Sequence, residues 1–305
     1  MTCPMTPARW ALTLAAYALP AAAVLLLAPL FGSQAIDTLD AARRFFAGQP
    51  NEATDILVYQ RIPRVILALL AGGALALAGA AFQVILRNDL AEPFTLGVTG
   101  GAAVGALTAI MIPALSLRFG GSVQLLALLG AAASLGLVYR LARRPHGISM
   151  NTLLLAGVTI SILSAGIVMF LRYLAGPEHL VAMDRWLMGG LGVIGYRDLA
   201  PLLPLLLPGA ALLLVQAPAL SQLSLGEELA AGHGVDVAWV QKMTFLGGGL
   251  ATAAVVSVAG PIGFVGLIVP HAVRRLSGFD QRLALPASFL LGGAFLAACD
   301  TAART

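Results

Sequence analysis

Long apolar stretches, separated by short polar ones, run along almost the whole chain. A helix needs about 20 apolar residues to cross the hydrocarbon layer of a membrane. About nine stretches approach this length. None holds Asp, Glu, Lys or Arg in its middle third, where a charge costs at least about 2.5–3.5 kcal/mol. The pattern predicts an all-α protein, a polytopic transmembrane helical bundle, with spans at residues 10–31, 64–86, 94–115, 122–141, 151–172, 199–216, 238–258, 261–277 and 282–299.

Two longer linkers have the composition of segments at the membrane surface. Residues 37–60 predict a short amphipathic helix and a turn outside the bilayer. Residues 173–198 combine Trp186, Tyr196, several glycines and charged side chains, which is typical of the interface between lipid and water. We therefore expect both linkers outside the hydrocarbon layer.

A third linker, residues 217–237, contains the sequence SLGEELAAGHGV at 224–235. It predicts a short helix between glycines on the membrane surface. Glu227 and Glu228 fall in its first turn, where the helix dipole favours negative charge. Two interpretations stay open, an ordinary loop helix and a rigid knob that docks a soluble partner.

The composition agrees with a membrane protein and excludes some other classes. Hydrophobic residues make up 59% of the chain and charged residues 10%, against about 25% charged residues in soluble domains. The net charge is +4 without a continuous Lys/Arg run, so nucleic acid is not an expected partner. Cys3 and Cys299 lie far apart in the sequence and form neither a disulfide framework nor a metal motif. The 18 Lys and Arg residues divide evenly between the two sides, so charge counting does not fix the orientation.

Small residues recur at helical spacing in one predicted span. Gly97, Gly101 and Gly105 are four residues apart, so they line one side of a helix and let another backbone approach closely. Helix packing alone accounts for this pattern. We expect this helix to be surrounded by protein.

The predicted span at 261–277 contains residues that weaken helices, namely Gly260, Gly263, Gly266 and Pro270. A proline inside a helix frees a backbone carbonyl and kinks the helix. Membranes tolerate such a break only where neighbouring groups or a water-filled cavity satisfy the freed carbonyl. We expect either a structural kink or a joint that moves.

Arginines open the second predicted span in the sequence RIPR. Arg61 and Arg64 are three residues apart, so we expect them to share a helix face that points out of the bilayer. Anchoring to lipid phosphates is one interpretation, and contact with a partner protein is another.

Several motifs are missing from the sequence. Lys242 is the only lysine and lies outside any Walker A motif, and no His, Cys, Asp or Glu cluster has metal-ligand spacing. The predicted spans also lack a central carboxylate to carry a proton or a sodium ion. We therefore expect no enzyme activity, no metal and no cofactor, and an ion-coupled carrier is disfavoured.

Residues 61–107, with the matching stretches 153–163, 224–235 and 260–304 in the same order, resemble the FecCD-type permeases of bacterial ABC importers. These permeases serve the type II importers for ferric siderophores, haem and cobalamin. The resemblance runs from about residue 10 to the last residue. It implies a ten-span fold, a homodimer with a transport path along its axis, two cytosolic ABC ATPase subunits below and a periplasmic substrate-binding protein above. It also implies a multi-pass protein of the bacterial inner membrane.

The resemblance assigns roles to individual residues. Leu225, Gly226 and Glu227 match the motif of the helix that couples the permease to the ATPase, and Glu228 follows them; residues 217–237 would form this cytosolic coupling loop. The arginines that contact the binding protein would be Arg61, Arg64 and Arg304. The glycine-rich stretch ending at Pro270 would be a gating joint.

The family pattern continues beyond the last residues of this sequence with a tenth span. We therefore expect a single transmembrane permease domain over residues 1–305, with about nine spans present and the C-terminal span of the family missing. The alternatives are an ion-coupled secondary transporter and a truncated, non-transporting membrane protein. The residues do not distinguish an iron–siderophore from cobalamin or haem as the substrate.

Overall fold

The computed structural model describes residues 7–32, 34, 36–49, 51–114, 122–144, 147–192, 195–197 and 199–305. Cys3 lies outside the described residues, and Cys299 is an exposed free cysteine. The described part is built almost entirely from helices, so the predicted all-α bundle is confirmed.

Within the described residues, six helices are long and apolar enough to cross a membrane. They are α1 (Pro7–Leu27), α4 (Ile62–Ile85), α7 (Val123–Ala142), α8 (Met150–Leu174), α13 (Val237–Ala259) and α15 (Gln281–Arg304). Helices α10 (Leu203–Val215) and α11 (Ala217–Leu223) meet at a bend of 52° and together form a further candidate span. These seven candidates overlap seven of the predicted spans.

The other two predicted spans, 94–115 and 261–277, form shorter helices. Helix α5 (Val98–Met111) has 14 residues, and α14 (Val265–Ser277) has 13. Each is shortened at its start by irregular backbone. The 3-10 turn η3 (Pro93–Leu96) and a left-handed Gly97 precede α5, whereas non-helical residues precede α14. A helix of this length falls short of the hydrocarbon thickness.

Short elements occupy the three linkers, as their composition predicted. The described short elements are η1 (Ala28–Leu30), α2 (Thr38–Phe46), α3 (Glu52–Asp55), the π-helix η2 (Ile56–Arg61), β1 (Arg143–Arg144), β2 (Gly147–Ile148), α9 (Pro177–Met188) and α12 (Glu227–Gly232). Strands β1 and β2 form a small antiparallel hairpin in which Arg143 pairs with Ile148.

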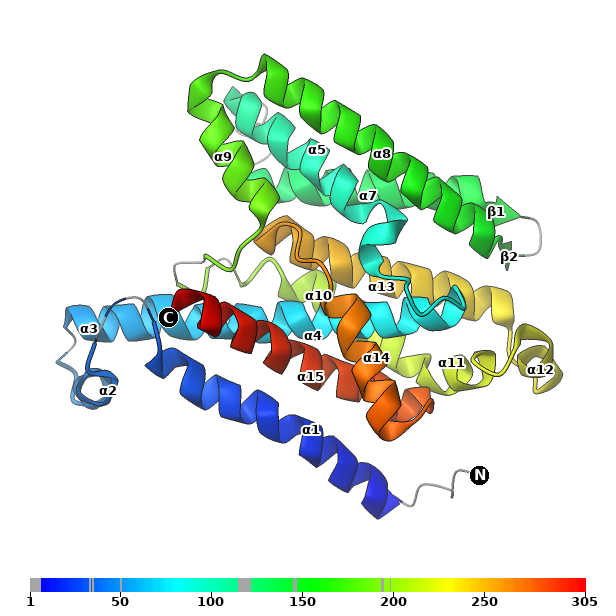
Figure 1. Cartoon of the computed structure of the whole chain (residues 1–305), viewed down its shortest axis with the longest axis horizontal. Helices are drawn as coiled ribbons and strands as arrows, with labels where there is room; N and C mark the ends of the chain where they lie inside the picture. Colours follow the sequence, from blue (N-terminus) through cyan, green and yellow to red (C-terminus); the bar gives the residue numbers. More distant parts are fainter. Residues whose placement is uncertain are drawn as a thin grey trace.

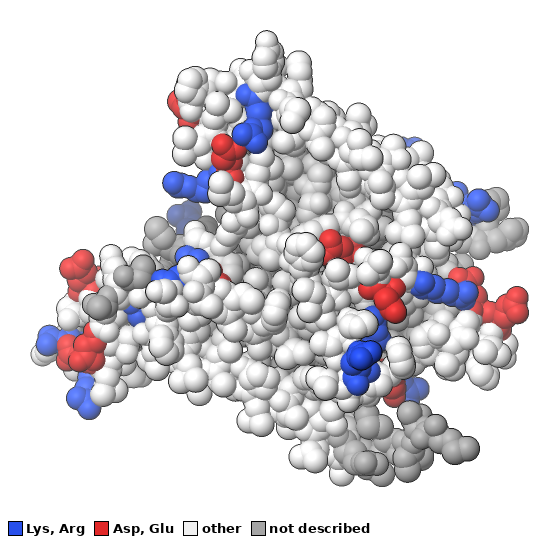
Figure 2. All heavy atoms as spheres, in the orientation of Figure 1, with Lys and Arg blue, Asp and Glu red and all other residues white. Residues whose placement is uncertain are grey.

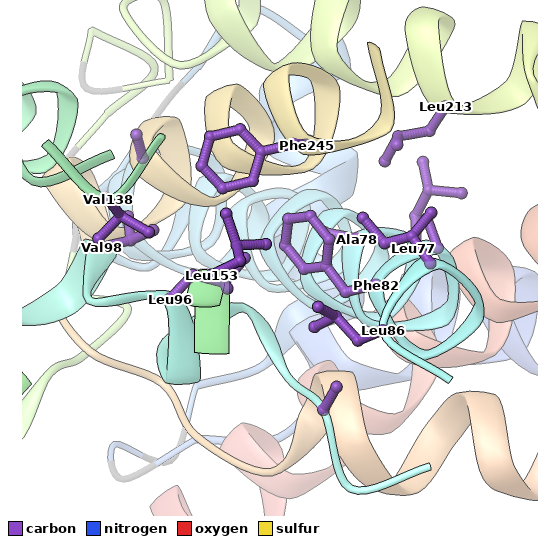
Figure 3. Close-up of a cluster of buried hydrophobic side chains, with 14 of the residues drawn as sticks. Leu77, Ala78, Phe82, Leu86, Leu96, Val98, Val138, Leu153, Leu213 and Phe245 are labelled. Atoms are coloured by element: carbon purple, nitrogen blue, oxygen red, sulfur yellow. The ribbon is translucent and has the colours of Figure 1, made fainter. Parts of the chain in front are cut away.

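Helix α4 lies at the centre of the bundle and packs against α13, α14 and α15 (Figure 1). In the apolar 18-residue stretch of each candidate span, 83% is buried inside the protein for the span that contains α4, compared with 11% for α1. A helix that is apolar on all sides is stable only when other helices surround it, which explains the nearly continuous apolar sequence of α4. Figure 3 shows Phe82 of α4 in the core with Leu213 of α10 and Phe245 of α13.

The two ends of the bundle differ in the elements they hold (Figure 1). The α12 end holds α12, β1, β2 and the last turn of α4, and the α2 end holds α2, α3 and the C-terminal residue. Figure 2 shows charged side chains at these ends, over α9 and in a group over α14, with uncharged atoms covering most of the remaining surface. This distribution fits helices that cross a hydrocarbon layer between two aqueous sides.

Candidate functional site

Helix α12 presents side chains that point away from the rest of the chain. Gly226 precedes the helix with a φ of 132°, which glycine adopts without strain. Leu225 is 68% exposed and Glu228 is exposed, whereas Ala230 is buried and anchors the helix. The predicted surface helix is therefore present, with Leu225 and Glu228 accessible to another protein.

Glu227 faces the helices of its own chain. Its Oε1 accepts a hydrogen bond from Nε2 of Gln241, on α13, at 3.3 Å. Nη2 of Arg87, at the end of α4, lies 3.6 Å from the same oxygen. These contacts connect α12 to two helices of the bundle.

Arg87 ends α4 in a backbone conformation that usually belongs to glycine. Its φ is 47°, and the N–H groups of Arg87 and Asn88 donate to the carbonyl oxygens of Val84 at 3.3 Å and Gln83 at 3.2 Å. This is the Schellman arrangement that closes a helix. A side chain in the left-handed region costs about 1–2 kcal/mol, so this position holds arginine at a cost, with its side chain directed at Glu227.

The turn after Arg87 is also connected to α14. Asp89 Oδ1 lies 3.1 Å from Nη2 of Arg274, whose side chain is almost fully buried. The turn at residues 86–90 thus carries one ion pair to α12 and another to α14. A displacement of α12 would act on this turn through Glu227.

Helix α14 continues through Pro270, the residue at which the sequence predicted a kink or a joint. Pro270 has no N–H to bond with the carbonyl oxygen of Gly266. Gln83, on α4, donates from Nε2 to that oxygen at 3.2 Å. At Gly79 an added methyl group would collide with the backbone of Gly266. A neighbouring helix therefore satisfies the freed carbonyl, as a break inside a membrane requires.

Irregular backbone links α13 to α14. Gly260 has a φ of 69°, and a methyl group there would lie 2.8 Å from the carbonyl oxygen of Trp186 and 2.9 Å from Cα of Gly189. Only glycine fits this close approach of two backbone segments without strain. Gly263 lies opposite the ring of Phe94 with ordinary spacing, so it has room for a side chain. Close backbone contacts are therefore made at Gly260 and Gly266 but not at Gly263.

The last residue before α14 is strained and exposed. Phe264 has a φ of 68° and is 67% exposed. Its backbone N–H bonds to Glu92, which lies between α4 and η3, outside the predicted spans. Burial raises the pKa of Glu92, and the hydrogen bond from Phe264 lowers it by a smaller amount. The irregular segments before α5 and α14 are thus bonded to each other.

The three glycines of α5 lie against neighbouring helices. Gly97 has a φ of 77°, and its carbonyl oxygen accepts a hydrogen bond from the hydroxyl of Ser134 at 2.7 Å. A methyl group at Gly101 or Gly105 would collide with a backbone carbonyl of α7, that of Gly130 or Leu126 respectively. The predicted close backbone contact is present at Gly101 and Gly105 within α5, whereas Gly97 precedes the helix in a left-handed conformation and does not share its face.

Arg61 lies at the α2 end but does not point outwards. Its guanidinium donates to the carbonyl oxygens of Pro29 at 3.0 Å, Leu30 at 3.3 Å and Gln34, and the residue is only 5% exposed. Carbonyls at the end of a helix lack partners within the helix, and Arg61 supplies donors to them. The prediction that Arg61 and Arg64 share an outward face is therefore wrong for Arg61.

Arg64 and Arg304 share one carboxylate. Nη2 and Nε of Arg64 lie 2.7 and 2.9 Å from the two oxygens of Asp300, and Nε of Arg304 lies 3.0 Å from Oδ2. The side chain of Arg64 is 30% exposed and that of Asp300 10%. This cluster joins α4 to α15, and its two guanidinium groups outnumber its one carboxylate.

Several of these residues were not predicted from the sequence. Gln83, Arg87 and Asp300 each bond to a residue far away in the chain. The only local signal was an arginine just after a long apolar span, at Arg87. Among the described residues, no group of three or more His, Cys, Asp or Glu is arranged to hold a metal ion.

Residues 20–305 match the model of a protein family described as the FecCD transport family. Curated proteins are similar over most of the chain. The cobalamin import system permease protein BtuC of Halobacterium salinarum is 42% identical over 257 residues, which are 84% of this chain and 69% of that protein. The Fe(3+) dicitrate transport system permease protein FecC of Escherichia coli is 34% identical over 94% of this chain and 88% of that protein.

Two further similarities extend the comparison. The hemin transport system permease protein HmuU of Yersinia pestis is 38% identical over 80% of this chain and 74% of that protein. A solved inward-facing conformation of a metal-chelate type ABC transporter superposes with a TM-score of 0.81 at 28% identity, covering 97% of this chain and 90% of that one. The sequence and the fold therefore lead to the same group of proteins.

Proposed function

The chain belongs to the FecCD transport family, and we propose that it is the permease subunit of an ABC importer that carries a metal chelate from the periplasm to the cytoplasm. The relatives are named for cobalamin, hemin and ferric dicitrate. Their common feature is a bulky chelated metal. We propose an iron–siderophore or a related chelate, cobalamin or haem, as the substrate.

The proposed assembly follows from the family. Two copies of this single permease domain would form a homodimer in the bacterial inner membrane, with the substrate path between them. Two cytosolic ATPase subunits would dock at the α12 ends and hydrolyse the ATP. A periplasmic substrate-binding protein would dock at the α2 ends.

The geometry of α12 carries this proposal. A coupling helix needs exposed side chains for the partner and firm contacts to its own subunit. Leu225 and Glu228 meet the first requirement, and Glu227 meets the second through Gln241 and Arg87. Gly226 supplies the turn that projects the helix. We assign residues 217–237 as the cytosolic coupling loop.

At the α2 end, Arg64 and Arg304 would meet acidic side chains of the binding protein. Asp300 holds both guanidinium groups in place, which lowers the entropy lost on docking. Arg61 contributes by fixing η1 beneath this surface rather than by contact with the partner.

The link before α14 would be the gating joint. Gly260 and Gly266 allow close backbone contact, and Pro270 removes a hydrogen bond that would stiffen α14. Gly97, Gly101 and Gly105 would hold α5 and α7 together as a rigid unit beside it. Helix movement at such breaks is typical of transporters.

Reconstitution in liposomes tests the proposal. The chain is combined with its partner ATPase and binding protein, and labelled ferric siderophore, cobalamin and haem are offered separately. We expect uptake of one chelate that requires both ATP and the ATPase. Uptake driven by an ion gradient through the chain alone would contradict the proposal.

The coupling loop is tested in the same system with Leu225→Asp. We expect this variant to lose ATPase binding and uptake together, because it places a charge in an apolar contact. Glu52→Ala, at an exposed position on the α2 end, is the control and should bind the ATPase like the unmodified chain. Equal ATPase binding by both variants would show that the ATPase docks on a different surface.

A further inference from the structure

An open cavity of about 280 Å³ lies at the α12 end, between the last turn of α7, the β1–β2 hairpin and the first turns of α13. The proposed function makes no use of it. The side chains that give it chemical character are Tyr139, Arg143, Arg144, Asp236, Trp239 and Lys242.

The cavity is strongly basic. It has three cationic side chains and one carboxylate, that of Asp236. Oδ1 of Asp236 already accepts a hydrogen bond from the backbone N–H of Trp239 at 3.0 Å, as the cap of α13. This hydrogen bond occupies one oxygen of the carboxylate. The cavity has two more positive than negative charges. The cavity therefore suits an anion.

The cavity also has the aromatic side chains of a membrane interface. Trp239 is 54% exposed, and Nζ of Lys242 lies 5.9 Å from the centre of its ring. Tryptophan and tyrosine gather where lipid headgroups meet the hydrocarbon layer. Tyr139 and Trp239 border the cavity from α7 and α13 respectively.

An apolar surface continues from the cavity towards the middle of the bundle. Leu246 follows Lys242 by one turn of α13 and is exposed. Gly136 has open space where a side chain would be. A ligand with an anionic head and apolar chains fits this combination, whereas a soluble anion makes no use of the apolar part.

We propose that this cavity binds the phosphate headgroup of an anionic phospholipid, with Arg143, Arg144 and Lys242 as its cationic ligands. The acyl chains lie along α13 beside Leu246. Basic pockets between transmembrane helices bind anionic lipid headgroups in this way. The proposal requires only that these helices cross a membrane, so it is independent of transport.

Fluorescence quenching tests the proposal on the full chain. Trp10→Phe and Trp186→Phe leave Trp239 as the only tryptophan. The protein is placed in phosphatidylcholine vesicles with a small fraction of brominated phosphatidylglycerol or, in a parallel arm, brominated phosphatidylcholine. We expect stronger quenching by the anionic lipid, since the cavity enriches it beside Trp239.

Paired variants distinguish the cavity from general charge effects. Arg143→Gln with Lys242→Gln should weaken the preference for phosphatidylglycerol about 25-fold, at about fivefold for each charge. Arg275→Gln with Arg282→Gln removes two exposed charges on α14 and α15 and should change it less than about twofold. Unchanged thermal unfolding of both variants verifies that they are folded.

Four results would overturn the proposal. Equal quenching by the two lipids would show that the cavity does not prefer the anionic lipid. Equal effects of the two pairs of substitutions would show that the cavity is not the binding site. Release of the lipid by millimolar inorganic phosphate would identify a site for a soluble anion. Release by the partner ATPase would identify a protein-docking surface instead.

Discussion

The carbonyl oxygen that Pro270 leaves without its helical partner is bonded by one buried amide side chain. Gln83 donates to Gly266 from Nε2, while its own Oε1 is buried and has no hydrogen-bond partner among the described residues. A buried carbonyl left unpaired costs about 1–3 kcal/mol. The hydrogen bond from Gln83 therefore avoids the cost of the carbonyl that Pro270 leaves without its helical donor.

A double-mutant cycle tests this dependence. Gln83→Met should lower the free energy of unfolding by about 1 kcal/mol, since it leaves the Gly266 carbonyl unpaired. In the Pro270→Ala background the same change should cost little, because the N–H of residue 270 then takes that carbonyl. Unfolding in detergent measures both effects. Additive effects would show that Gln83 and Pro270 act independently.

Asp300 is a second side chain on which the structure depends. Removing one partner of a buried ion pair costs about 3–5 kcal/mol, and Arg64 is 30% exposed, so Asp300→Asn should destabilise by about 2–3 kcal/mol. Asp40→Asn is the matched control, because its pair with Arg44 is exposed and contributes about 0.5 kcal/mol or less. Thermal unfolding of the two variants compares these costs; similar values would mean that Asp300 is dispensable.

Sequence reasoning succeeded where the interacting residues are close in the chain. The spacing of Gly101 and Gly105 predicted their shared face, and the SLGEEL motif predicted α12. It failed for pairs such as Gln83 with Gly266 and Arg64 with Asp300, which are 183 and 236 residues apart. Polar partners across helices depend on the packing of the whole bundle, and one sequence does not reveal that packing.

At the scale of elements, backbone irregularity explains the shortened helices. The hydrophobic pattern predicted where helices lie but not where they start, since the residues before α5 and α14 are as apolar as the helices. Positive φ angles at Gly97, Gly260 and Phe264 end the regular backbone there. The apolar composition of a segment indicates that it lies in a membrane. Its backbone geometry determines how much of the segment is helical.

The contact between α5 and α7 offers a direct test of close helix packing. Gly105→Ala should lower the free energy of unfolding by about 1–3 kcal/mol, because its methyl group would collide with the carbonyl of Leu126. Gly136→Ala, on α7 with open space around it, should be neutral or stabilise by up to about 1 kcal/mol through helix propensity. Unfolding in detergent gives both values. A neutral Gly105→Ala would mean that the helices are free to separate.

At the scale of the whole molecule, two ends with different chemistry are joined by one central helix. Helix α4 begins beside the arginine cluster at the α2 end and ends beside α12. It also contacts α14 through Gly79 and Gln83. The same helix therefore contacts both ends and the helix that follows the proposed gating joint.

Substitution of Arg87 should have different effects on the free energy of unfolding and on ATP-driven uptake. Its left-handed backbone costs about 1–2 kcal/mol, and its exposed ion pair with Glu227 returns about 0.5 kcal/mol or less. Arg87→Gly should therefore leave the free energy of unfolding unchanged or raise it by up to about 1 kcal/mol. If the pair transmits movement from α12 to α4, the same variant should lower ATP-driven uptake severalfold without loss of ATPase binding. Arg87→Lys keeps both the charge and the strain and should retain most uptake. Full uptake by Arg87→Gly would exclude this ion pair from the coupling path and leave Gln241 and α13 as the connection.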